Sequence, residues 1–575
     1  MKKLFLLLTI CLTQTSNNVF AESNKDWLID GSSYKAKIYE KGQDVVLTNG
    51  LVERVFRNGT TIRVNNLVTG EGLLRSVRPE AEVVLNDIHI PVGGMTGQTV
   101  HNYLLAEWLE TMKADTMAMH CTGYETELIK PRFDWKPRKE WMSTDPVWPA
   151  KGKELIFSYK ADDALIKRIQ NLYSSNESRK IYTDADFTTT MPEGWKIVTS
   201  KSNGANTFVN EGKAGEILIP ANTSSFAEKE IPANTEILIA KINPGTDKSA
   251  SWGPGMTWVF NNKTIKAYIR TSENKFSVTG LGNEFELNFK GYKPGEAVAF
   301  KMQRIKGFVI CSYSYDEKTW KELGRVNLAD DAVSQCVRVG KMDLRGNAKE
   351  TNTPGETGRC RVDYVKALGA INKKETKAEF DYLKDVKVKV HYEIYDGIPL
   401  ISKWITIEND SKQEILLNSY KSEILAVTEP ENQACFDHGF RTPNITVESD
   451  FAHCREKYPD NPRENLQTER HVDWIPDPLY KTQTNWLMQL PCLLESTPKY
   501  GPAVDIQANQ DFDSHRIWEL FHDTRERERK TLQIRKMYRI AAPWVAENPI
   551  FMHVRKADNE SVKKAVDQCA EVASK

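Results

Sequence analysis

Short runs of alternating apolar and polar residues, separated by turn residues, fill residues 44–93. The pattern begins VVLTNGLVERVFRNGTTIRVNN and ends AEVVLNDIHIPVGG, and Asn49-Gly50 and Asn58-Gly59 lie between runs. Alternation with a period of two indicates strands with one buried face, and Asn-Gly pairs favour tight hairpin turns. This part of the chain therefore predicts antiparallel sheet.

The clearest strand pair lies at residues 386–410. Val386, Val388 and Val390 alternate with polar residues, and Asp396-Gly397 supplies a turn into a second apolar run. We expect one face of this hairpin to be buried and the other face to be wet.

The composition changes between residues 181 and 370, where Asn, Thr, Ser and Gly are frequent. This block contains strand-like segments of similar length at regular spacing, which is typical of a sandwich. These segments are MTWVFNN, TIKAYIRTS, KFSVTG, FELNFKG, AVAFKMQRI, GFVICSYSY and RVGKMD. Because sheet-like sequence resumes after this block, we interpret the block as a domain inserted into a larger β-domain, after a charged and weakly helical linker at residues 161–180.

The last part of the chain changes pattern again. An apolar run at residues 550–554 is followed by a segment in which Val562, Ala565, Val566 and Cys569 recur at helical spacing. This order predicts a strand followed by a helix, which is the opening unit of an α/β domain.

Composition describes a neutral, folded protein. The 575 residues include 78 basic and 78 acidic side chains, so nothing favours nucleic acid as a partner. Lys2-Lys3, an apolar core and a small residue at Ala21 indicate a signal peptide at residues 1–21, which predicts a secreted or periplasmic protein. No other segment approaches 18 apolar residues, so we expect no membrane span. The cysteines are scattered without zinc spacing, and neither a metal nor a cofactor is predicted.

Residues 471–480 combine polar and aromatic side chains that suit a sugar. Asp473 and Asp477 offer acceptors for sugar hydroxyls, and Trp474 and Tyr480 offer flat apolar faces. The long stretch around them, residues 432–480, reads as irregular, and segments of that kind often carry function. A structural loop that packs a domain junction is the alternative interpretation.

Two tryptophans of the inserted block, Trp252 and Trp320, are further candidates for stacking on a glycan. Sandwich cores also use tryptophan, so core packing is the alternative. Asp523, Glu526 and Glu528 alternate with arginines, and we interpret them as an ion-paired segment and not as catalytic carboxylates.

Three segments resemble the N-terminal β-supersandwich and barrel junction of family 36 (clan D) α-galactosidase-like glycoside hydrolases. They are LVERVFRNGTTIRVNNLVTGEGLLRSVRPEAEVVLNDIHIPVGG, VHYEIYDGIPLISKWITIEND and WELFHDTRERERKTLQIRKMYRIAAPWVAENPIFMHV. The inserted block separately resembles a laminin-G or concanavalin-like jelly roll, including the phrase SYDEKTW that ends at Trp320.

The resemblance implies a mainly β protein: a β-supersandwich interrupted by a jelly-roll sandwich, with a C-terminal βα remnant of a (β/α)8 barrel. The expected domains are a first supersandwich part at 22–180, the jelly roll at 181–370, a second part with the junction at 371–547 and a truncated βα unit at 548–575. The family's two catalytic aspartates lie on later barrel strands, so no catalytic residue is predicted here.

We therefore expect a secreted carbohydrate-processing protein that resembles the non-catalytic, glycan-contacting half of such an enzyme. One alternative is a retaining glycoside hydrolase that is active only with a barrel on a separate partner chain. Another is a non-enzymatic structural or protein-interaction module. The expected partner is a galactoside-like poly- or oligosaccharide.

Overall fold

The computed structural model describes most of the chain between residues 26 and 573. Within that range the description omits residues 100–101, 139–141, 143–145, 174–178, 200–207, 210–214, 218–223, 249–251, 282, 289–294, 306, 330, 348–358, 372–379, 431–441, 452, 457–465, 470, 478–489, 500, 548–551 and 557. The predicted signal peptide at residues 1–21 lies outside the described residues.

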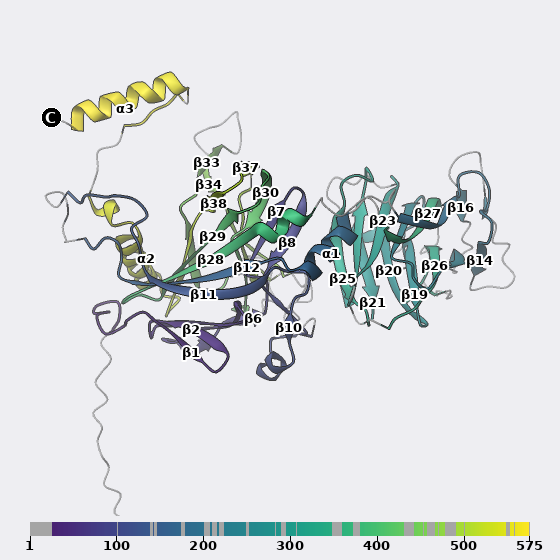
Figure 1. Cartoon of the computed structure of the whole chain (residues 1–575), viewed down its shortest axis with the longest axis horizontal. Helices are drawn as coiled ribbons and strands as arrows, with labels where there is room; N and C mark the ends of the chain where they lie inside the picture. The colour runs from purple at the N-terminus through teal and green to yellow at the C-terminus, as the bar shows by residue number, and fades with distance from the viewer. Residues whose placement is uncertain are drawn as a thin grey trace, which may run out of the picture.

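The chain is mainly β, as predicted, and its strands form two groups of antiparallel sheets that lie side by side (Figure 1). Strand β12 (Gly152–Lys160) pairs with β28 (Val386–Tyr395), although some 225 residues separate them in sequence. The intervening strands form sheets of their own. We call residues 179–371 the insert and the sheets formed by the chain on either side of it the frame.

The frame consists of several sheets around one large apolar core. Its largest sheet has the order β11 (His120–Leu128), β12, β28, β29 (Leu400–Asn409), β39 (Ile517–Phe521) and β32 (Ile445–Ser449), with β38 (Gln510–Asp513) also paired to β29. A second sheet contains β1 (Lys37–Lys41), β2 (Asp44–Thr48), β3 (Val52–Arg57), β4 (Thr60–Asn66) and β5 (Glu71–Gly72).

Smaller sheets complete the frame. One has the order β37 (Val504–Ile506), β30 (Ile415–Lys421), β7 (Ala81–Leu85) and β8 (Ile88–Val92), and another has the order β35 (Val472–Ile475), β36 (Leu493–Ser496), β31 (Glu423–Val427) and β6 (Leu74–Ser76). Two strand pairs are β9 (Met95–Thr96) with β10 (Lys113–Ala114) and β33 (His453–Glu456) with β34 (Leu466–Glu469). The described residues of the stretch at 432–480, which was predicted to be irregular, therefore include four short strands, β32 to β35.

The insert is a sandwich of two sheets with its own core. The first sheet has the order β15 (Phe208–Val209), β16 (Gly215–Ile217), β27 (Cys360–Ile371), β18 (Ile237–Asn243), β23 (Val298–Ile305), β24 (Phe308–Ser314) and β25 (Lys321–Asn327), with β13 (Arg179–Asp186) also paired to β27. The second has the order β14 (Lys196–Thr199), β17 (Ser225–Glu230), β26 (Ser334–Lys341), β19 (Pro254–Phe260), β20 (Lys263–Arg270), β21 (Lys275–Gly280) and β22 (Asn283–Asn288). This arrangement agrees with the predicted jelly-roll-like sandwich.

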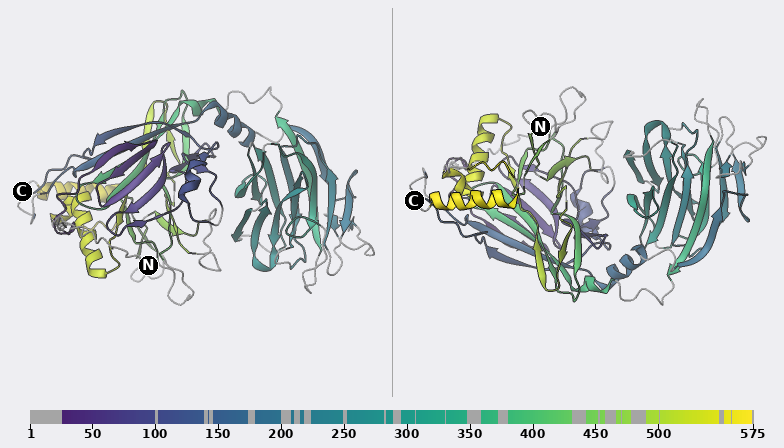
Figure 2. Two further views of the ribbon diagram at one scale, coloured as in Figure 1. Left: turned by 90° about the horizontal axis from the view of Figure 1, so that it is seen from below. Right: turned by 90° about the horizontal axis from the view of Figure 1, so that it is seen from above.

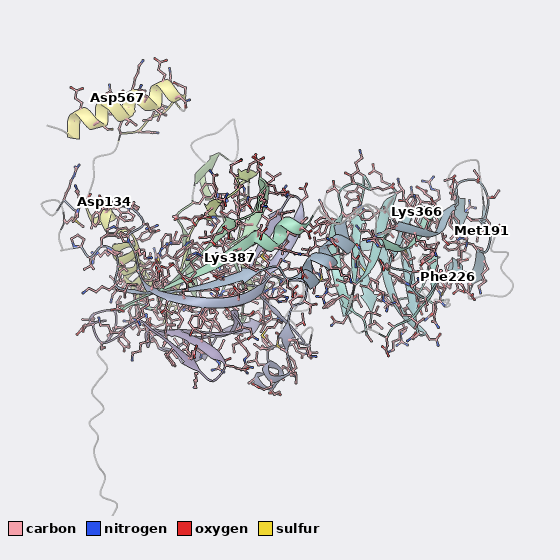
Figure 3. The ribbon with its side chains drawn as sticks, viewed as in Figure 1. Asp134, Met191, Phe226, Lys366, Lys387 and Asp567 are labelled. Carbon is pink, nitrogen blue, oxygen red and sulfur yellow. The ribbon has the colours of Figure 1, made fainter. Side chains whose placement is uncertain are left out.

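The predicted hairpin at 386–410 is present as β28 and β29, and the alternating valines of β28 are fully buried. The prediction of a wet opposite face is only partly right. Lys387 (Figure 3) is half-exposed, but farther along the strand His391 and Glu393 are 9% and 1% exposed. His391 stacks on Trp404, with ring centroids 4.5 Å apart, and Glu393 accepts a hydrogen bond from Arg516. Side chains distant in sequence therefore cover this end of the sheet.

A fully buried group of charged residues lies among the frame sheets. Arg54 and Lys403 both donate to Glu423, at 3.1 and 2.8 Å, and Arg54 also lies 3.4 Å from Glu80. Burial would raise the pKa of Glu423, but the neighbouring Arg54 and Lys403 lower it. Burial and the charge of Glu423 raise the pKa of Glu519, which favours its neutral form. Two cations thus balance two carboxylates, as burial of charge requires.

Helices are few. Helix α1 (Asp163–Tyr173), in the predicted linker, lies between frame and insert (Figure 2). Helix α2 (Arg527–Ala541) packs on the frame, and short 3₁₀ turns form at η1 (Ala106–Glu110), η4 (Thr271–Glu273), η5 (Asp381–Asp385) and η6 (Pro543–Ala546). Among the described residues, no helix has the length and apolar character needed to cross a bilayer.

The predicted C-terminal βα unit is only half present. Its helix forms as α3 (Asn559–Ala573), but residues 552–556, which include the end of the predicted strand, are not a strand. A β-strand needs a neighbour to satisfy its backbone, and residues 552–556 pair with no strand that the structure describes. Helix α3 stands away from the sheets (Figure 1) and exposes Val562, Val566 and Val572.

Candidate functional site

The structure separates the predicted sugar contacts at 471–480. Asp473 and Trp474 belong to strand β35, where Asp473 is half-buried and lies 3.5 Å from Lys499, and Trp474 packs partly against the frame core. Tyr480 lies outside the described residues. The segment predicted as a loop is therefore a paired strand along Val472–Ile475.

The prediction for Asp477 requires a correction. This carboxylate has no exposed surface, accepts a hydrogen bond from Ser76 at 3.2 Å and lies 3.6 Å from a nitrogen of Arg78. A sugar hydroxyl cannot reach it while the frame is folded. Asp477 instead ties the chain after β35 to the segment around β6.

The two predicted tryptophans of the insert belong to different sheets. Trp252 is half-buried and lies just before β19 of the second sheet. Trp320 is also half-buried and lies in the turn between β24 and β25 of the first sheet. The structure therefore does not combine them into one surface.

Trp320 lies on the outer face of the first sheet, the face turned away from the second sheet. Its ring packs against Ile237, Ile239 and Leu368, which are buried beneath it, and beside the half-buried Tyr364. These residues come from β18 and β27, whose register pairs Ile237 with Leu368. The indole plane is thus supported by an apolar floor while part of it stays open to solvent.

The turn that carries Trp320 is fixed by side-chain caps. Asp316 accepts hydrogen bonds from the backbone N–H groups of Lys318 and Thr319, at 2.9 and 2.7 Å, and these bonds lower its pKa. The hydroxyl of Ser314 accepts from the N–H of Glu317 at 2.9 Å. Such local bonds are the usual means by which Asp and Ser hold a turn, and here they place Trp320 and Glu317 over the sheet.

A polar group borders the Trp320 ring. The hydroxyl of Tyr364 donates to one carboxylate oxygen of Glu317 at 2.6 Å, and the ammonium of Lys241 donates to the other at 2.6 Å. Partial burial would raise the pKa of Glu317, but Lys241 and Tyr364 lower it. Burial and Glu317 raise the pKa of the Tyr364 phenol, which therefore stays protonated.

Lys301 of β23 completes this surface. It lies opposite Ile239 in the register, and its ammonium is 4.6 Å from the centroid of the Trp320 ring. A cation at that distance is attracted by the ring. Burial and the nearby Arg179 lower the pKa of Lys301 to about 8. We call Trp320, Tyr364, Glu317, Lys241 and Lys301 the Trp320 face.

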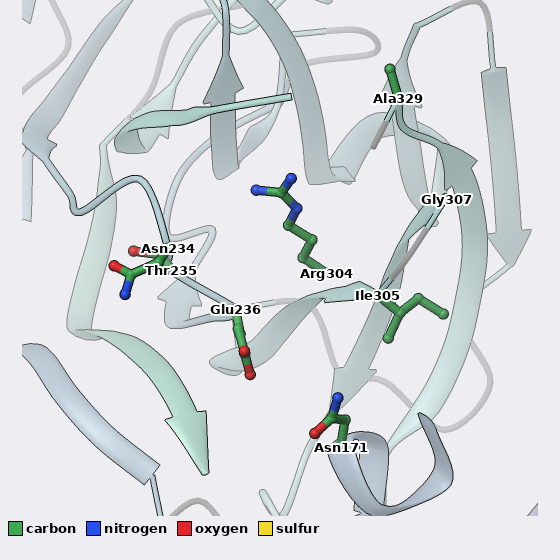
Figure 4. Close-up of a pocket in the computed structure, with 8 residues that line it drawn as sticks. All are labelled: Asn171, Asn234, Thr235, Glu236, Arg304, Ile305, Gly307 and Ala329. Atoms are coloured by element: carbon green, nitrogen blue, oxygen red, sulfur yellow. The ribbon is translucent and has the colours of Figure 1, made fainter. Parts of the chain in front are cut away.

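A cavity lies at the start of β18 and the end of β23 (Figure 4). Its volume is about 450 Å³, and Glu236, which lies directly before β18, is ion-paired with Arg179 at 2.9 Å. In Figure 4 Asn234 and Glu236 lie on one side and Ile305 on the other, with Arg304 between them. The lining residues are Asn171, Asn234, Thr235, Glu236, Arg304, Ile305, Gly307 and Ala329.

A second group of aromatic side chains lies in the frame and was not predicted as a site. Phe133, Trp135, Trp148 and Trp544 pack against one another mostly edge to face, with centroids 4.9 to 6.3 Å apart. The guanidinium of Arg132 lies 5.7 Å from the centroid of the Trp544 ring. Because each ring contacts other rings, we interpret this group as local packing at one end of the frame. It does not present a single aromatic ring with one face available to a sugar.

The acidic segment before and within α2 is structural, as the sequence suggested. Asp523 and Asp26 both pair with Arg529, at 2.6 Å, and Glu526 caps the helix by accepting from two backbone N–H groups. In the part of the chain that the structure describes, no three His, Cys, Asp or Glu side chains gather in a way that could hold a metal ion.

Similarity to known proteins is found among solved structures, at low sequence identity. No protein-family model and no curated protein sequence matches the chain. Among solved structures, a β-glucanase of Bacillus licheniformis has 9% identity and a TM-score of 0.23, covering 33% of this chain and 98% of the other.

Two further solved structures have the same TM-score of 0.23. The exoplasmic/lumenal domain of VIP36 in its Ca²⁺- and mannose-bound form has 11% identity over 35% of this chain and 93% of that one. A family 16 endo-glucanase from Bacteroides ovatus has 10% identity over 32% and 99%. With TM-scores this low, we draw nothing about this chain from these similarities.

Proposed function

We propose that this protein is an exported carbohydrate-processing protein that binds glycan through the Trp320 face. Its frame would correspond to the glycan-contacting, non-catalytic part of an α-galactosidase-like glycoside hydrolase, as the sequence resemblance implies. The observation that carries the proposal is the Trp320 ring, held open on an apolar floor beside hydrogen-bonding groups. A sugar presents both an apolar C–H face and hydroxyls, and this surface offers a partner for each.

We expect this face to bind and not to hydrolyse. A glycosidase places two carboxyl groups across the sugar, and its acid has a raised pKa. Glu317 instead has both oxygens engaged by Tyr364 and Lys241 and a lowered pKa. It is therefore suited to hold its neighbours in place and to accept from a hydroxyl.

The direct experiment measures glycan binding by the full chain and by a Trp320→Ala variant. Neutral and acidic plant and microbial oligosaccharides are screened on an array, and the bound ones are titrated by calorimetry. We expect Trp320→Ala to weaken binding at least tenfold, because the stacking plane is lost; a tenfold change is about 1.4 kcal/mol. Trp135→Ala is the matched control, since Trp135 is a half-buried ring in the frame group.

Equal affinity of wild type and Trp320→Ala for every bound glycan would overturn the proposal, as would the lack of binding to any glycan. The Trp252→Ala variant tests the separate prediction that Trp252 stacks on sugar. Measurable hydrolysis of an aryl α-galactoside by the purified chain would contradict the non-catalytic assignment.

A further inference from the structure

Three lysines on the central strands β18, β23 and β27 point outward from the sheet that carries Trp320, and they differ in their partners. Lys241 donates to Glu317 at 2.6 Å, and Lys366 (labelled in Figure 3) lies 3.7 Å from Asp184. Within the described residues, Lys301 has no carboxylate at ion-pair distance, and its contact is the Trp320 ring. One cation of this surface therefore lacks a compensating anion.

The surroundings of Lys301 make that imbalance costly. Arg179 lies close enough to destabilise the protonated form of Lys301, and its own carboxylate partner is Glu236. Partial burial removes water from the ammonium, and a cation with little water and a like-charged neighbour gains more from an added anion than an exposed lysine does. Although its pKa falls to about 8, Lys301 is still mostly protonated at neutral pH.

The position of Lys301 indicates where such an anion would sit. Its ammonium is 4.6 Å from the centroid of the ring that we propose as the stacking plane. We expect a sugar that packs on the solvent-exposed part of the Trp320 ring to place its substituents near this ammonium. A carboxylate or sulfate on the sugar would supply the anion that the protein does not.

We propose that the Trp320 face selects anionic sugars, such as uronates or sulfated sugars, and that Lys301 determines this selectivity. The inference rests on the proposed glycan binding and adds the chemical class of the ligand. The stacking plane gives general affinity for a sugar ring, and the unpaired ammonium distinguishes charged from neutral rings. Glu317 does not oppose this selection, because Lys241 and Tyr364 already engage both of its oxygens.

The test compares three probes of matched length by calorimetry on the full chain at low salt: a neutral galacto-oligosaccharide, an oligogalacturonate and a sulfated galacto-oligosaccharide. We expect at least one anionic probe to bind tenfold or more tightly than the neutral one. Added salt reduces the preference, because it screens a partly exposed ion pair. Raising the pH above 8 also reduces it, because Lys301 then loses its proton.

The variant Lys301→Gln should lower the ratio of anionic to neutral affinity to about one, and Lys301→Arg should retain most of it. Lys229→Gln is the matched control, a half-buried lysine of the other sheet that donates to a backbone carbonyl; it should leave the ratio unchanged. Tighter binding of the oligogalacturonate would identify a carboxylate ligand, and tighter binding of the sulfated probe would identify a sulfate ligand.

Equal binding of the neutral and anionic probes, or a preference that persists in Lys301→Gln, would overturn the selectivity while leaving glycan binding in place. Failure of every probe and every array glycan to bind would overturn the proposed function and the selectivity together.

Discussion

The frame and the insert both gather lysine, arginine and glutamate side chains on their sheets, but in different surroundings. In the frame, Arg54 and Lys403 are fully buried together with Glu423 and Glu80, so two cations face two carboxylates. On the insert, Lys241 and Glu317 form a half-open pair, whereas Lys301 lies beside the Trp320 ring with no carboxylate of the described residues at ion-pair distance. Buried charges must be compensated within the protein, whereas a half-open surface can leave a charge for a ligand.

The largest expected effect comes from breaking the buried group. Arg54→Met leaves Lys403 alone against Glu80 and Glu423, and we expect the frame to lose about 3–5 kcal/mol of stability. The matched change on the insert, Lys241→Met, removes a cation from a half-open pair and should cost less than about 1 kcal/mol. Urea unfolding followed by hydrogen exchange of strands β3 and β18 measures both. A similar loss of stability in the two variants would contradict this difference between the buried charges of the frame and the half-open pair of the insert.

Acid should destabilise the frame more than the insert. Burial lowers the pKa of His522 to about 4, whereas an unfolded histidine titrates near 6.5. Below about pH 6.5 His522 binds a proton in the unfolded chain but not in the folded frame. The contribution of His522 to the free energy of unfolding is therefore fully present above about pH 6.5 and is lost as the pH drops toward 4. The loss attributable to His522 is at most about 3 kcal/mol.

Above about pH 5, where carboxyl groups do not yet take up protons, the insert should lack this sensitivity, because none of the ten histidines lies between residues 179 and 371. Thermal unfolding between pH 7 and pH 4, with hydrogen exchange to assign each transition, checks the prediction. Burial lowers the pKa of His515 in the same direction, so His522→Gln should remove part of the slope and not all of it. A slope that His522→Gln leaves unchanged would refute the assignment.

Much of the fold could be predicted from local pattern. The valines of β28 alternate because one face of the strand meets the core, and that signal is contained in the sequence itself. The same strand also shows the limit: His391 and Glu393 look like wet positions, yet Trp404 and Arg516 cover them. Burial by such partners cannot be read from the alternation alone.

The site was predicted less completely. Trp320 was selected as a candidate from its chemistry and stays a prediction, and the alternation in AVAFKMQRI places Lys301 on the face opposite the buried Phe300 and Met302. Tyr364 reaches Glu317 only because β27 returns to pair with β18, and no local pattern shows that. Asp477 was misassigned because its polarity suggested exposure, whereas Ser76 and Arg78, some 400 residues earlier, enclose it.

The most direct test of the central claim is hydrogen exchange of the full chain with and without a glycan that it binds. We predict that the glycan slows amide exchange in the turn from Ser314 to Trp320 and in β23, while β35 with Asp473 and Trp474 exchanges at the same rate. Slower exchange in β35 with no change around Trp320 would contradict binding at the Trp320 face and would place the glycan contact on the frame.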